Sequence, residues 1–204
     1  MATLQMDQRN YIVHPLRFAL WLFILTIIMI FGSLTSAYIV QKGMLIEPLI
    51  FDLPSILWNN LIIILFSSVT MQYAVYAARR EENQRAVIAL LMTFVLGCFF
   101  LWGQWQAWID LTESGLPFVD NTRLDEGSGG RSDNSVSFFY IFTGLHGLHI
   151  VAALIVLVFA VVNTGLSRYK KEKKRLTYSL TATFWHFLGL LWLYLFVFLK
   201  YTEN

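Results

Sequence analysis

Cysteine is almost absent from this 204-residue sequence, which has only Cys98, inside an apolar segment. One thiol cannot form an internal disulfide, a two-thiolate copper centre, an iron–sulfur cluster or a covalent haem attachment. A redox cofactor held by this chain alone would have to use its four histidines. Charge is also scarce, at 14% of residues against roughly a quarter in a soluble domain. The composition excludes an ordinary soluble domain, and a net charge of +2 does not indicate nucleic-acid binding.

The remaining sequence is dominated by five long apolar segments without Asp, Glu, Lys or Arg. They are residues 18–40, 56–78, 86–109, 138–162 and 177–199. Each is long enough for a helix of about 20 residues to cross roughly 30 Å of hydrocarbon. The first is longer than the apolar core of a signal peptide, so we expect it to be a retained span. The pattern predicts an all-α integral membrane protein, a bundle of five transmembrane helices in a single domain over residues 1–204.

The connections between the five segments differ in charge. One side carries eleven basic and four acidic residues, and the other carries four basic and nine acidic residues. The positive-inside rule predicts a cytoplasmic N-terminus and, after five crossings, a periplasmic C-terminus. The basic run 168–175 is expected to attract anionic lipid headgroups, and the polar connection 110–136 is expected to be an exposed outer loop.

The five segments lack the buried charges that ion-coupled transporters place in their pathways. A solitary transporter is therefore a weak alternative. The chain is expected to depend on partners for its activity.

Histidines are the notable polar residues in the last two segments. His146 and His149 are three residues apart and so share a helix face. At about 1.5 Å per residue, His149 and His186 lie at similar depth and could meet near the membrane midplane. Such a pair would suit a haem b-binding membrane cytochrome. The simpler interpretation is hydrogen bonding between helices, with Gly144, Gly147 and Gly189 allowing close approach.

Polar residues recur at helical spacing in the second segment, and lipid cannot bond to them. We expect these residues to face other helices. They are Asn60, Ser67, Ser68, Met71 and Gln72. The pattern fits both helix–helix contacts and a lipid groove.

Two segments also carry a recognisable family pattern. Residues 138–157 and 184–201 resemble the last two helices of cytochrome c oxidase subunit III, a pattern shared with bacterial quinol oxidases. Residues 17–43 and 67–80 give weaker support. Together they resemble the last five helices of a seven-helix family. The two N-terminal helices of the long form have no counterpart in this sequence, as is typical of bacterial members.

This resemblance implies subunit III of a haem-copper terminal oxidase in a bacterial inner membrane. In such an oxidase the haems and copper belong to the larger subunits, where oxygen is reduced to water and protons are pumped. The implied partners are subunits I and II, a small subunit IV and membrane phospholipid, and membership of a larger respiratory assembly stays open. Subunit III itself binds no redox metal, stabilises the largest subunit, holds lipid and sustains proton uptake.

The resemblance also assigns roles to particular residues, none of them catalytic or metal-binding. Six residues match the family motifs and are expected to make structural contacts between helices: Gly144, His146, Gly147, His149, Trp185 and His186. Five others are candidates for lipid contact: Asn60, Ser67, Thr70, Arg79 and Arg80.

The sequence departs from the family at two positions that usually hold carboxylates. Thr26 and Ile27 stand where the family pattern reads Ser-Glu, and Leu188 and Gly189 follow the Trp-His-Phe motif where an Asp is usual. Functions assigned to those carboxylates do not carry over to this chain.

Overall fold

The computed structural model describes residues 15–44, 54–116, 135–165 and 171–202. These residues form five helices, each long and apolar enough to span a membrane. The helices are α1 (Pro15–Gly43), α2 (Ile56–Arg79), α3 (Asn83–Glu113), α4 (Ser135–Gly165) and α5 (Lys171–Thr202). The prediction of five membrane-spanning helices is confirmed.

The helices are longer than the apolar segments that predicted them, because helix geometry continues into the polar residues that flank each span. The predicted outer loop 110–136 illustrates this. Its first residues belong to α3, which ends at Glu113, and α4 already begins at Ser135. The central part of that loop, residues 117–134, lies outside the described residues.

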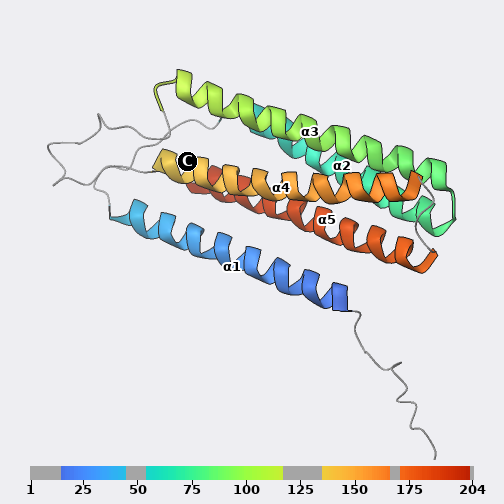
Figure 1. The fold of residues 1–204 in the computed structure, drawn as a ribbon. Coiled ribbons are helices and arrows are strands. Elements are labelled where there is room, and N and C mark those ends of the chain that lie inside the picture. The colour runs from blue at the N-terminus through green and yellow to red at the C-terminus, as the bar shows by residue number, and fades with distance from the viewer. Residues whose placement is uncertain (1–14, 45–53, 117–134, 166–170, 203–204) are drawn as a thin grey trace, which may run out of the picture.

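Four of the helices form a bundle, in which α2 packs against α3 and α5, and α4 packs against the same two helices. A tight turn joins α2 to α3, with Glu81 in the left-handed region at a φ of 65°. The first helix lies along the outside of this bundle and contacts only α4 and α5 (Figure 1). The interior of the bundle is therefore shared by α2, α3, α4 and α5.

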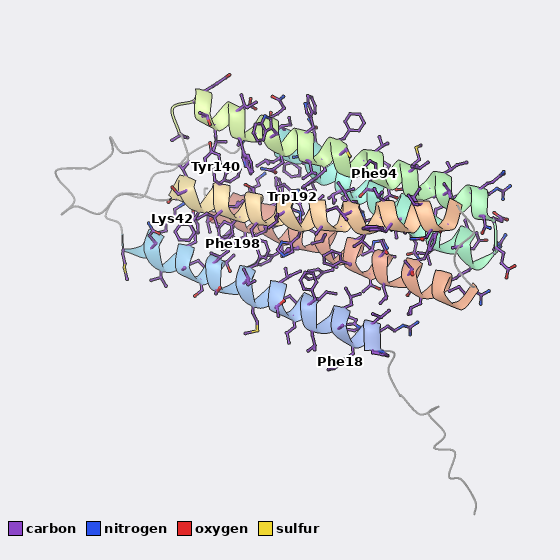
Figure 2. The ribbon with its side chains drawn as sticks, in the orientation of Figure 1. Phe18, Lys42, Phe94, Tyr140, Trp192 and Phe198 are labelled. Atoms are coloured by element: carbon purple, nitrogen blue, oxygen red, sulfur yellow. The ribbon has the colours of Figure 1, made fainter. Side chains whose placement is uncertain are left out.

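The first helix is attached mainly through aromatic side chains. Tyr38 is fully buried, with its ring centroid 5.6 Å from that of Phe138 on α4 and 5.8 Å from that of Phe198 on α5. The Tyr194 hydroxyl donates to the Thr35 hydroxyl at 3.2 Å. Figure 2 labels Phe198 where α1 approaches the bundle. The attachment is apolar for most of the length of α1.

Large apolar side chains cover much of the outer surface, including Trp21, Phe66 and Leu190. In water such a surface would favour aggregation, whereas lipid tails solvate it. The charged groups instead gather at the helix ends. One end of the molecule, here called the basic end, holds five arginines: Arg17, Arg79, Arg80, Arg85 and Arg175.

Candidate functional site

The two histidines that the sequence places at one depth face different helices. The His149 Nδ1–H donates a hydrogen bond at 2.7 Å to the Leu145 carbonyl oxygen, and its ring lies beside Phe23 and Phe31 of α1. His186 instead lies 3.3 Å from the Gln72 amide oxygen on α2. Because the His149 ring lies against α1 and the His186 ring against α2, the structure does not bring these rings together. The sequence predicts depth from helical rise, but not rotation about the helix axis.

His146 lies inside the four-helix bundle and is completely buried. Its ring centroid is 5.1 Å from that of Trp192 on α5 and 5.7 Å from that of Phe100 on α3. His146 therefore contacts two other helices. Within the part of the chain that the structure describes, no group of three or more His, Cys, Asp or Glu side chains is arranged to hold a metal ion.

Trp185 forms the central polar contact between α5 and α2. It is completely buried, and its indole Nε1–H donates to the Ser67 hydroxyl at 3.0 Å. The Ser67 hydroxyl in turn donates to the Ile64 carbonyl oxygen at 2.7 Å. A second polar contact joins α2 to α3 through the hydroxyls of Thr70 and Thr93, 2.8 Å apart. These hydroxyls join neighbouring helices in a segment where lipid offers no hydrogen bonds.

The residues predicted to contact lipid differ in exposure. Asn60 and Ser67 are completely buried in the bundle. Arg79 and Arg80 are exposed at the basic end. Gln72 is exposed, yet its amide oxygen lies 3.3 Å from His186 on α5, so it also contacts another helix.

Of the glycines that the sequence singled out, Gly189 lies closest to a neighbouring helix, since an added Cβ would lie 3.3 Å from the Ser68 hydroxyl oxygen. A Cβ added at Gly144 would lie 3.6 Å from Trp108, and one at Gly147 would lie 3.8 Å from Leu101, both ordinary contact distances. At Gly97, an added Cβ would lie only 2.7 Å from the Leu154 side chain and 2.8 Å from the Trp185 ring. The sequence alone does not reveal this contact, because Trp185 lies 88 positions after Gly97 and only the folded bundle brings them together.

The basic end contains a cavity of about 460 Å³, formed where α1, α2 and α5 approach one another. Three of its lining residues are arginines from these three helices, Arg17, Arg79 and Arg175. The Arg175 guanidinium also donates to the Arg79 carbonyl oxygen at 3.5 Å. The sequence indicates Arg79 as a candidate for lipid contact. It does not indicate that Arg17, on another helix, lines the same cavity. Arg80 does not line the cavity, and its guanidinium lies 4.4 Å from the centroid of the Tyr76 ring.

Comparison with known proteins identifies a family that matches this sequence. The family model described as cytochrome c oxidase subunit III matches residues 1–203. The chain belongs to the cytochrome c oxidase subunit III family.

Individual relatives agree with this membership. A protein of Rickettsia bellii named "probable cytochrome c oxidase subunit 3" is 29% identical over 91% of this chain and 68% of its own length. A protein of the same name from Rickettsia felis is 30% identical over 82% of this chain and 56% of its own length. One from Mycobacterium tuberculosis is 32% identical over 66% of this chain and 60% of its own length. The chain thus spans between about half and two thirds of these relatives.

The two departures from the subunit III pattern are both packed inside the structure. Ile27 on α1 and Gly189 on α5 are both buried. A carboxylate at either position would need a buried hydrogen-bonding partner or a proton. Isoleucine and glycine need neither.

Proposed function

We propose that this chain serves as subunit III of a haem-copper terminal oxidase, a multi-pass protein of a bacterial inner membrane. The single observation that supports this most directly is the subunit III family match over residues 1–203, on a chain with five membrane-spanning helices. The larger subunits would carry the haems and copper, reduce oxygen to water and pump protons. The basic end would face the cytoplasm, as the excess of arginine at that end favours.

Within that complex, the proposed role of the chain is accessory. It would stabilise the largest subunit, hold phospholipid and sustain proton uptake without a redox centre of its own. The polar side chains within its spans support this role, because they are used between helices, as in the Trp185–Ser67 contact. The different directions of His149 and His186 count against the rival in which they hold a haem b between them.

The proposal is tested by a reduced-minus-oxidised absorption spectrum of the complex that copurifies with this chain in mild detergent. We expect the haem spectrum to stay with the partner subunits, unchanged, when this chain is stripped away. A haem b spectrum that follows the isolated chain would contradict the proposal. A complex without any haem would contradict it as well.

Lipid binding has a specific candidate location in the cavity of the basic end. Arg17, Arg79 and Arg175 come from three helices and line one space, and a phospholipid phosphate could accept hydrogen bonds from more than one of them. Apolar surface from Val75, Ala78 and Leu176 lies next to these guanidinium groups. This combination suits an anionic headgroup whose acyl chains continue along the helices.

Removing two of the three guanidinium groups should weaken lipid retention. We expect R79Q/R175Q to lower the retention of anionic phospholipid by roughly thirtyfold, at about 1 kcal/mol per basic residue near a membrane surface. The measurement is the anionic lipid bound per purified complex, by native mass spectrometry. The matched control R80Q/R85Q removes the same charge outside the cavity and should retain the lipid. Equal losses in both variants would indicate nonspecific attraction by the basic end.

A further inference from the structure

Four buried polar side chains, one from each helix of the bundle, have no hydrogen-bond partner among the described residues. They are Asn60 on α2, Gln104 on α3, His146 on α4 and Trp192 on α5. Their exposed fractions are 0%, 3%, 0% and 1%, respectively. Together they hold seven buried nitrogen or oxygen atoms, all the unpartnered ones in the described part of the chain. We call this set the polar quartet.

The polar quartet lies at one level of the bundle, around a single turn of α3. The Asn60 amide packs directly against Gly103, where an added Cβ would collide with the amide oxygen. Gln104 is the next residue. Phe100, one turn earlier, has its ring centroid 4.9 Å from that of Trp192 and 5.7 Å from that of His146. Figure 2 labels Trp192 between α3 and the lower helices of the bundle.

The chemistry of the quartet restricts what can bind there. Each amide offers two N–H donors and one acceptor oxygen, neutral imidazole offers one donor and one acceptor, and indole offers one donor. All four side chains are thus uncharged or readily neutral. The apolar segments that contain them have no Asp, Glu, Lys or Arg, so a bound ion would have no counter-charge. The matching ligand is small, neutral and able both to donate and to accept.

We propose that the polar quartet binds ordered water inside the bundle, joining α2, α3, α4 and α5 at one level. Water meets the requirement for mixed donors and acceptors, and buried water typically forms about three hydrogen bonds with otherwise unpartnered groups. Because each quartet member comes from a different helix, a shared water fixes the rotation of four helices relative to one another. The quartet is thus a hydration site with a structural role, separate from the arginine-lined cavity at the basic end.

Radiolytic footprinting in ¹⁸O-labelled water tests this directly on the full chain in its native complex, reconstituted in lipid discs. X-rays convert ordered water to hydroxyl radicals in place, and these oxidise the adjacent side chains. Trp185 is the internal control, since it is as buried as Trp192 and on the same helix, but its Nε1–H is bonded to the Ser67 hydroxyl. We expect Trp192 to incorporate ¹⁸O about tenfold faster than Trp185, as bound water at the quartet requires.

Equal labelling of the two tryptophans would overturn the proposal and would mean that the quartet members bond directly to one another. A second comparison uses N60L/Q104L, which removes two amides from the quartet. In folded complex, this variant should lower the labelling of Trp192 to the level of Trp185. Persistent fast labelling of Trp192 in that variant would place the water elsewhere and would also overturn the assignment. The wild-type comparison decides the question even where this variant does not fold.

Discussion

Replacing Gly97 by leucine is expected to destabilise the bundle strongly. The first added atom would lie 2.7 Å from the Leu154 Cδ2 atom and 2.8 Å from the Trp185 Cη2 atom. Trp185 cannot move aside, because it is completely buried and its Nε1–H is bonded to Ser67. Overpacking of this kind typically costs about 1–3 kcal/mol. The measurement is the thermal unfolding midpoint of the chain in detergent, together with its yield from membranes.

Gly32 provides a matched control for this prediction. It lies within α1, and an added Cβ at that position has no atom of another element within 4 Å. Leucine there would extend into lipid and should leave the unfolding midpoint nearly unchanged. If G32L and G97L lowered the midpoint equally, the loss would reflect glycine's general role in helices and not the contact between α3, α4 and α5.

Removing the Trp185 side chain is the second large effect that we expect. The substitution W185A leaves a cavity beside Gly97 and removes the donor that binds Ser67, at a cost of about 3–5 kcal/mol. W102A is the control, because Trp102 is on the exposed surface of α3. Its loss should change the free energy of unfolding far less. Chemical denaturation of the detergent-solubilised chain measures both values.

The two substitutions should also compensate for each other. G97L fills space that W185A empties, so the double variant should be more stable than the sum of the single losses predicts. Side chains in contact typically couple by about 0.5–3 kcal/mol. Strict additivity in the double-mutant cycle would show that Gly97 and Trp185 do not share a contact in the folded protein.

The number of helices could be predicted from the sequence because the bilayer imposes a minimum length and an apolar composition on each spanning segment. Each apolar segment must satisfy its backbone groups internally, so length and composition are sufficient to predict a helix. Depth within the membrane follows from helical rise in the same way. The rotation of each helix about its own axis cannot be predicted in this way, because it depends on which neighbouring helices pack against it. His149 and His186 illustrate the difference, since their rings face α1 and α2 respectively.

The contacts of polar and small residues could likewise be predicted only in part from the sequence. The sequence indicated that α2 has a polar face, and Asn60 and Ser67 are indeed buried on it. It could not indicate that Gln72 is exposed while it contacts His186, or that Gly97 is packed against the Trp185 indole. The three arginines of the basic-end cavity come from separate parts of the chain, so only the packing of α1, α2 and α5 brings them together.

The sparse attachment of α1 has a consequence for the order of synthesis. Among the described residues, its helix contacts are with α4 and α5, which follow α2 and α3 in the sequence. As the chain grows from its N-terminus, α1 is made before α2 to α5, so its binding surface is complete only after α4 and α5 have been inserted. Docking of α1 therefore has to follow insertion of the α2–α3 hairpin and of both helices that α1 contacts.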